Sequence, residues 1–362
     1  MKSNPPKKES RVDTFIANNW EFLIDPNLFS DLNKKISESK VKIPRSFWQK
    51  KINSGFIKLG QKKIKSGSRI DESQKKLISI DWKNILKDIE ICYLEKIIPY
   101  PGNLNVIYED NNFLVINKSA PISTHPAYPI TDSNVRDASL VDQIMFRQEN
   151  KKNLLNQRVG VVHRLDKKTT GLILWAKNRE YERYLKNLFK KRLIEKEYLA
   201  LVEGEPKNDN FEIRGWMGKW KKNPLKRFFM PLSEKNPGRE IINPKESLSK
   251  VKLLLKGSPI DFQKAKSNPY QDFYLTWLNL VPELFDSQKK YSLLKIKILT
   301  GRTHQIRVHL ASLKIPIVGD ELYGIKPKTN YSSAQALHSY KISFRDKNKK
   351  AVKIINSTPI FT

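Results

Sequence analysis

One segment limits the fold of this chain more than any other. A charged turn, His163-Arg164-Leu165-Asp166, stands just before the apolar run GLILWAK at residues 171–177. The β-branched, aliphatic and aromatic content of this run predicts a buried strand. Polar turns often precede such strands, and Asp166 could simply accept hydrogen bonds from backbone donors there. The residue types alone therefore leave a structural and a functional interpretation open.

Other segments indicate a mixed α and β architecture. Strand-like composition recurs at residues 113–117, 196–204 and 291–301. Residues 181–192 and 303–314 instead place apolar side chains at helical spacing, which predicts two amphipathic helices whose polar faces remain free. The stretch 207–290 is weakly patterned, and its elements are not assigned.

The charge balance favours a polyanionic partner. Lys and Arg total 68 against 37 Asp and Glu, giving a formal net charge of +31. Nucleic acid is the leading partner for such a chain. The alternative is a biased composition with basic residues spread over a solvated surface.

Cysteine usage and hydropathy bear on the compartment. Cys92 is the only cysteine, so an intramolecular disulfide and a thiolate metal cage are both excluded. No apolar stretch approaches the ~20 residues that a membrane span requires. We therefore expect a soluble protein without a membrane partner, located in the cytoplasm.

Residues 41–99 form a candidate module of their own. The segment 41–80 predicts a short helix that gives way near Gly55 to small strands. Its order of basic helix, glycine turn, short strand and basic turn resembles the S-four-type RNA-binding module. We expect three apolar residues to pack inward and basic residues to face phosphates, the alternative being an ordinary amphipathic surface. The inward residues are Phe56, Ile57 and Leu59, and the basic ones are Arg45, Lys50, Lys51, Lys58, Lys62 and Lys63.

The segment 163–177 resembles the signature of the RluA-type family of RNA pseudouridine synthases. That signature is His-Arg-Leu-Asp, two variable residues, Thr-Ser-Gly, and an apolar strand ending in Ala-Lys. Thr170 replaces the usual serine and keeps a hydroxyl that can bond the turn. Further blocks agree in content and order, at residues 191–204, 301–324 and 335–344.

The resemblance implies a domain organisation and a fold class. The fold is α+β, with a central, mostly antiparallel sheet, a basic cleft across it and helices outside. Residues 1–40 are then an N-terminal extension and 100–362 the catalytic domain, with 207–290 as a divergent insertion. The block 106–126 opens this domain, but Ser119 and Pro121 depart from the family pattern and leave the conformation of that loop open.

The same resemblance assigns the reaction and its residues. Pseudouridine synthases isomerise a uridine without a cofactor, and Asp166 matches the catalytic aspartate. The aspartate either bonds or stabilises an electron-poor sugar, or removes a sugar proton to form a glycal, and the sequence does not decide between these routes. Arg307 matches the arginine beside it and favours its ionised form; it could instead pair with a surface carboxylate. Tyr198 matches the residue that stacks on uracil, although a strand tyrosine is otherwise often a core residue.

Several basic residues of the motifs are candidates for contact with RNA. Arg164 resembles the residue that fills the gap left by a flipped uridine. His163 is assigned to RNA binding. Lys196 and Arg302 are assigned to phosphate or structural contacts, because the isomerisation itself does not need their charges. The expected partner is large-subunit ribosomal RNA, with transfer RNA as the alternative, and the protein is expected to be a monomer.

Three other functions would use some of the same residues. A metal site would draw on the five histidines, but their spacing lacks the helical pair with an intervening glutamate, so we expect no metal. A glycoside hydrolase usually needs two carboxylates, and the key motif holds one. A noncatalytic RNA-binding protein of the same fold would be compatible with the altered loop at Ser119. The histidines are His125, His163, His304, His309 and His338.

Overall fold

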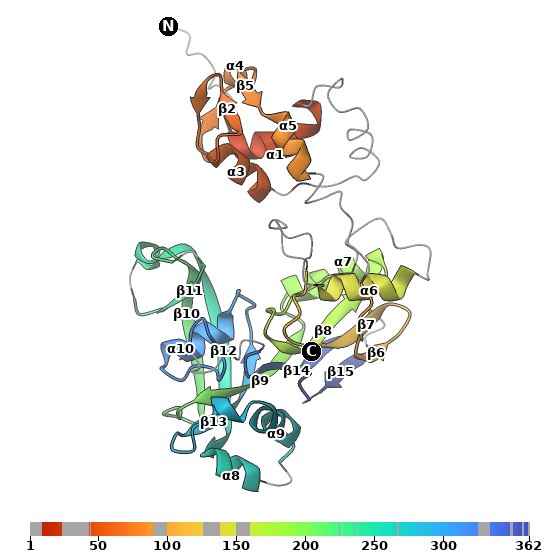
Figure 1. Ribbon diagram of the computed structural model, residues 1–362, viewed down its shortest axis with the longest axis vertical. Coiled ribbons are helices and arrows are strands. Elements are labelled where there is room, and N and C mark those ends of the chain that lie inside the picture. Colours follow the sequence, from red (N-terminus) through yellow and green to blue (C-terminus); the bar gives the residue numbers. More distant parts are fainter. Residues whose placement is uncertain are drawn as a thin grey trace. The chain divides into compact units, whose positions relative to one another are not determined.

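The protein is described by a computed structural model as two compact units (Figure 1). The described residues are 9–23, 43, 45–89, 100–125, 138–149, 160–223, 225–234, 236–265, 268–324, 334–347, 350–356 and 358–360. Those up to Ile89 form the first unit and those from Tyr100 onward the second, and Cys92 lies outside the described residues. None of the helices in the described ranges is long and apolar enough to cross a membrane.

The first unit packs short helices around a small tryptophan-rich core. The predicted helix is α3 (Arg45–Asn53), and small strands follow it as expected. The helix α1 (Val12–Leu23) shares this core, with Trp20 lying 5.7 Å from Trp48 between ring centroids. The predicted extension of residues 1–40 thus contains a helix, α1, whose apolar face packs against α3 of the predicted module. The other elements are β1 (Ser10–Arg11), β2 (Ile57–Leu59), β3 (Lys62–Lys63), β4 (Arg69–Ile70), α4 (Glu72–Lys75), β5 (Ile78–Ile80) and α5 (Trp82–Ile89).

The basic residues of this unit differ in their surroundings. Ile57 is fully buried, as predicted, while Phe56 and Leu59 are half-buried. Arg45 donates to the buried carboxylate of Asp13 at 2.9 Å, so it holds α3 against α1. Contact of Arg45, Lys50 and Lys58 with RNA stays a prediction, and so does the S-four-type resemblance.

The second unit is built on a ten-stranded, mostly antiparallel sheet, which confirms the predicted fold class. Its strand order is β11-β10-β12-β13-β9-β14-β8-β7-β6, with β15 paired to β14. Among the described pairs only β14 and β8 run parallel. The four predicted strands are β7 (Phe113–Lys118), β8 (Thr170–Ala176), β9 (Glu195–Glu203) and β13 (Tyr291–Ile298). The remaining strands outside the 207–290 stretch are β6 (Val106–Glu109), β14 (Leu337–Arg345) and β15 (Ala351–Ile355).

Gly171 explains part of the charged-turn motif. It adopts φ +110°, and a Cβ at this position would lie 2.5 Å from the backbone of Ser339. Only glycine therefore lets β8 approach β14 in parallel register. The hydroxyl of Thr170 bonds the Nδ1 atom of His338 at 2.8 Å across the same pair, so the replacement of serine is accommodated.

Residues 207–290, the predicted divergent insertion, contribute strands to the central sheet. They contribute β10 (Asn210–Trp220), β11 (Arg227–Pro231) and β12 (Ile241–Gly257), and β12 pairs directly with β13. Many residues of β12 are exposed or half-buried and polar residues interrupt its apolar ones, so its pattern in the sequence is weak. The segment also forms α8 (Pro259–Lys264), α9 (Gln271–Leu280) and two 3-10 turns, Pro237–Arg239 and Pro282–Leu284.

Helices flank the sheet (Figure 1). The two predicted helices are α7 (Arg179–Lys190) and α10 (Gln305–Ser312), and α6 (Leu140–Glu149) is a further helix of this unit. The apolar stripe of α7 is buried as expected. The polar face of α10 is not free, because Gln305, Arg307 and His309 are all buried. That face points into the unit and supplies part of a cleft.

Candidate active site

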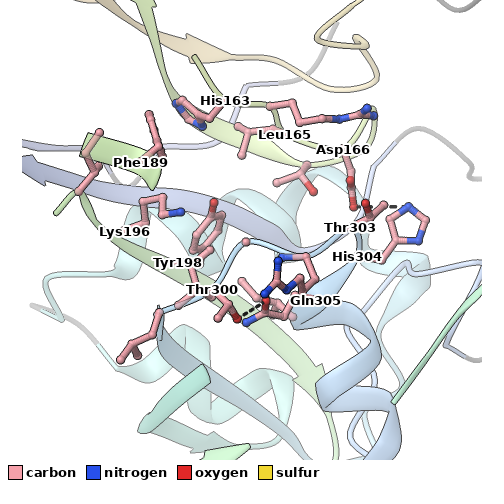
Figure 2. Close-up of a pocket in the computed structure, with 18 of the residues that line it drawn as sticks. His163, Leu165, Asp166, Phe189, Lys196, Tyr198, Thr300, Thr303, His304 and Gln305 are labelled. Atoms are coloured by element: carbon pink, nitrogen blue, oxygen red, sulfur yellow. Dashed lines mark hydrogen bonds and ion pairs between the residues drawn. The ribbon is translucent and has the colours of Figure 1, made fainter. Parts of the chain in front are cut away.

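A basic cleft of about 720 Å³ crosses the second unit (Figure 2). Its walls are the charged turn before β8, the start of β9, and the loop from β13 to α10. All three segments carry motifs that the sequence singled out, although they are far apart along the chain. The cleft brings Asp166, Tyr198 and Arg307 together with Arg164, His163, Lys196 and Arg302.

Asp166 and Arg307 meet as predicted. An Nη atom of Arg307 donates to Asp166 at 3.2 Å. Burial lowers the pKa of Arg307, but hydrogen bonds from its guanidinium to Asp320 and the charges of both aspartates outweigh burial and raise that pKa. Asp320 accepts from Arg307 twice, at 2.8 Å each, and is itself buried. The arginine is therefore fixed by a bidentate ion pair and presents its remaining edge to Asp166.

His304 also lies beside Asp166. It directly precedes α10 and adopts a left-handed conformation, with φ 60°. Its Nδ1 atom and the hydroxyl of Tyr323 share a hydrogen bond of 2.8 Å, and the same hydroxyl accepts from the Arg227 N–H. Burial lowers the pKa of His304, while the charge of Asp166 raises it. The Nε2 atom of His304 lies 3.9 Å from the carboxylate oxygen that Arg307 contacts.

The turn that carries Asp166 is held by residues that the sequence reasoning missed. Lys118 is fully buried and donates to the carbonyl oxygens of Ser119, Ile122 and Lys167 at 2.7, 2.8 and 3.3 Å. Burial lowers the pKa of Lys118 to about 7, while the charge of Asp166 raises it. The hydroxyl of Thr124 also bonds both backbone groups of Leu165. The Asn-Lys pair in the opening block was the available signal for Lys118.

The start of α10 is anchored by β12, the strand that the sequence left unassigned. The amide of Gln305 accepts from Thr300 at 2.7 Å and donates to Ser249 at 3.0 Å. The ring of His309 bonds Ser247 and Ser249 at 2.9 and 3.0 Å, and burial lowers its pKa to about 3. These buried bonds set the orientation of α10 and hence of Arg307.

Tyr198 and Lys196 occupy the same face of β9 and point into the cleft (Figure 2). Tyr198 is buried, and burial raises its pKa. The ammonium of Lys196 lies 5.2 Å from the centroid of the Phe189 ring, which in turn packs on His163 at 4.7 Å. Burial lowers the pKa of Lys196 to about 8.

The predicted RNA-binding residues of the cleft differ in exposure. Arg164 is exposed at the cleft wall. His163 instead accepts from the Leu174 N–H at 2.8 Å, and burial lowers its pKa to about 3. Arg302 donates to the Glu246 carbonyl at 3.0 Å, which ties the loop before α10 to β12. His163 and Arg302 therefore have structural contacts in addition to any role toward RNA.

The rival metal site finds no supporting geometry in the part of the chain that the structure describes. No group of three or more His, Cys, Asp and Glu side chains there could hold a metal ion. The rings of His163, His304, His309 and His338 are each hydrogen-bonded within the protein instead.

The mixed sheet and its basic cleft define the pseudouridine synthase class of RNA-modifying enzymes. The chain belongs to the RNA pseudouridylate synthase family, whose model matches residues 112–312. The predicted RluA-type membership is thereby confirmed, and the protein is an RNA pseudouridine synthase.

Similar proteins agree with this membership. The chain is 28% identical over 352 residues to ribosomal large subunit pseudouridine synthase D of Borreliella burgdorferi, which covers 96% of this chain and 86% of the relative. It is 30% identical over 282 residues to the protein of that name from Blochmanniella floridana, covering 78% and 68%. Human RNA pseudouridylate synthase domain containing 1 shares the fold, with a TM-score of 0.51 at 23% identity over 71% of this chain and 85% of that one.

Proposed function

We propose that Asp166 is the catalytic carboxylate of this enzyme, that Arg307 orients it, and that Tyr198 stacks on the target uracil. The observation that carries this proposal is the 3.2 Å contact from Arg307 to Asp166 inside the basic cleft. Arg307 is itself pinned by Asp320, so Asp166 meets a preorganised positive charge. Arg164 lies exposed beside Asp166 and is suited to replace the flipped uridine in its stack.

The proposed substrate is a uridine of large-subunit ribosomal RNA. Two similar proteins carry ribosomal large subunit in their names, and one of them is matched along 96% of this chain. The net charge of +31 fits a large polyanion. The basic residues Lys58, Lys62 and Lys63 of the first unit would extend the contact with RNA. Transfer RNA is the alternative substrate.

The test is pseudouridine mapping in cells with the gene intact, deleted, or restored as Asp166→Asn. Carbodiimide-dependent reverse-transcription stops are measured on ribosomal and transfer RNA. A stop in large-subunit ribosomal RNA should vanish on deletion and return only with the wild-type gene, because asparagine offers neither a nucleophilic nor a basic oxygen. With purified protein, the substitution should lower the rate by at least ~10⁴-fold while RNA binding is retained. A lost stop in transfer RNA would reject the proposed substrate, and a stop restored by the asparagine variant would reject the role of Asp166.

A further inference from the structure

Lys196 is a half-buried cation in the cleft that lacks a partner in the described part of the protein. No described carboxylate or carbonyl oxygen accepts from its ammonium, whose recorded neighbour is the face of Phe189 at 5.2 Å. An ammonium withdrawn from water without a hydrogen-bond acceptor is unfavourable, and burial accordingly lowers the pKa of Lys196 to about 8. This cost suggests that its partner arrives with the substrate.

The other buried and half-buried charges that line the same cleft have partners within the described protein, whereas Arg164, Lys190 and Arg192 are exposed to water. Arg307 forms ion pairs with Asp320 and Asp166, and Lys297 forms one with Glu195 at 2.6 Å. His163 is neutral, since burial lowers its pKa to about 3. Lys196 is thus the partly buried positive charge that the described residues leave available to a bound nucleotide.

The isomerisation creates a negative charge that needs such a cation. In either route the bond from uracil N1 to ribose C1′ breaks, and its electron pair leaves with the base. The resulting charge spreads over N1, O2 and O4 until C5 bonds to C1′ and the C5 proton is lost to solvent or a base. Asp166 acts on the sugar in both routes, either bonded to C1′ or holding the C2′ proton until it returns to the sugar, and does not stabilise this charge on the base. A preorganised donor at the base is therefore required for the largest rate gain.

We propose that Lys196 is a catalytic residue whose ammonium hydrogen-bonds to a carbonyl oxygen of the target uracil and stabilises the base after its bond to the sugar breaks. Lys196 and Tyr198 are two residues apart on one strand face, about 7 Å along β9. In Figure 2 Asp166 and Lys196 lie toward opposite ends of the cleft, with Tyr198 between them. A nucleotide with its sugar at Asp166 and its base on Tyr198 would direct a base oxygen toward Lys196. No proton is transferred from the ammonium, and the inference rests on the proposed roles of Asp166 and Tyr198.

This inference differs from the phosphate contact that the sequence favoured. A phosphate contact would contribute to binding in the ground state, whereas contact with the departing base acts mainly in the transition state. Loss of a phosphate contact would therefore raise the dissociation constant of RNA, whereas loss of a contact with the departing base would lower the rate at saturating enzyme.

The experiment is single-turnover release of tritium from total RNA labelled at uridine C5, isolated from cells that lack the gene. Labelled total RNA makes the result independent of which RNA is modified. Lys196→Met should lower the rate at saturating enzyme by about 100-fold, with the dissociation constant changed less than about threefold. Lys196→Arg keeps the charge and should recover at least ~10-fold of the loss. The matched control is Lys186→Met, which removes an exposed lysine on α7 and should change neither quantity.

Each other outcome overturns the proposal. Weaker binding with a wild-type rate at saturation would make Lys196 a phosphate contact, and no change in either would leave it without a role in turnover. If the methionine variant fails to fold, Lys196→Gln replaces it, and equal rates for the glutamine and arginine variants would refute a role for the charge. Asp166→Asn, measured alongside, tests the proposed function separately: release by that variant rejects the role of Asp166 whatever Lys196→Met does.

Discussion

The two ends of the cleft differ in how their charges are balanced. At one end Arg307 lies between Asp320 and Asp166, with contacts of 2.8 and 3.2 Å. The buried Lys118 at this end donates hydrogen bonds to backbone carbonyl oxygens around the turn that carries Asp166. At the other end Lys196 faces the ring of Phe189 and a neutral His163. The first end is complete in the folded protein, whereas the second lacks an acceptor among the described residues.

This difference separates two kinds of site residue. A buried ion pair with satisfied hydrogen bonds orients its members before the substrate arrives. A desolvated cation without a partner raises the free energy of the folded protein and lowers it only when a negative group binds. A charged group that is paired within the protein is therefore suited to position other groups. A buried charged group without a partner is suited to bind the substrate.

The largest expected effect is a contrast in stability between the two ends. Arg307→Met leaves Asp166 and Asp320 without their counter-charge, so we expect unfolding free energy to fall by about 3–5 kcal/mol. Lys196→Met removes an unpaired charge and should leave that free energy within about 1 kcal/mol of the wild type, or raise it. Urea denaturation of both variants measures the contrast. Equal losses would show that Lys196 has a structural partner and would remove the distinction between the ends.

A smaller effect, on the reaction rate, is expected from weakening the ion pair between Asp320 and Arg307. Asp320→Asn keeps one acceptor for Arg307 but removes the charge and the second acceptor of the bidentate pair. The guanidinium then shifts relative to Asp166, and the single-turnover rate should fall by up to about 100-fold with little change in RNA affinity. Glu212→Gln, which alters an exposed ion pair with Lys250, is the control and should be silent. A wild-type rate for Asp320→Asn would mean that Arg307 needs no second carboxylate.

The smallest predicted effect is a difference between two pH profiles. Burial lowers the pKa of Lys196 to about 8, so its charge is present below that pH and is lost as the pH rises through it. The wild-type single-turnover rate should therefore fall about tenfold between pH 8 and 9.5 relative to Lys196→Arg, which keeps its charge. If the two pH profiles are parallel, loss of the Lys196 charge does not cause the fall in the wild-type rate.

The groups that face Lys196 do not produce this difference. Burial lowers the pKa of His163 to about 3 and raises that of Tyr198, so neither changes its protonation between pH 8 and 9.5. Lys297, Arg302 and the buried Lys118, whose pKa burial lowers to about 7, are present in both proteins. Effects that are common to both proteins cancel when the two profiles are divided.

Elements with a local pattern could be predicted from the amino-acid sequence. The apolar run of β8 and the stripe of α7 follow from side chains a few residues apart, and the ordered motifs implied that Asp166, Tyr198 and Arg307 share one site. Strand β12 escaped detection because one of its faces is partly exposed, so its signal depends on the strands beside it.

Only the tertiary structure decided which polar residues are buried and what each contacts. The pairing of Asp320 with Arg307, the carbonyl oxygens around Lys118, and the bonds from His309 to β12 join segments that the sequence does not align. The same is true of Lys196, which in the sequence is one lysine among many. Burial and charge balance arise from the whole surroundings of a side chain, and those surroundings form only when distant segments pack together.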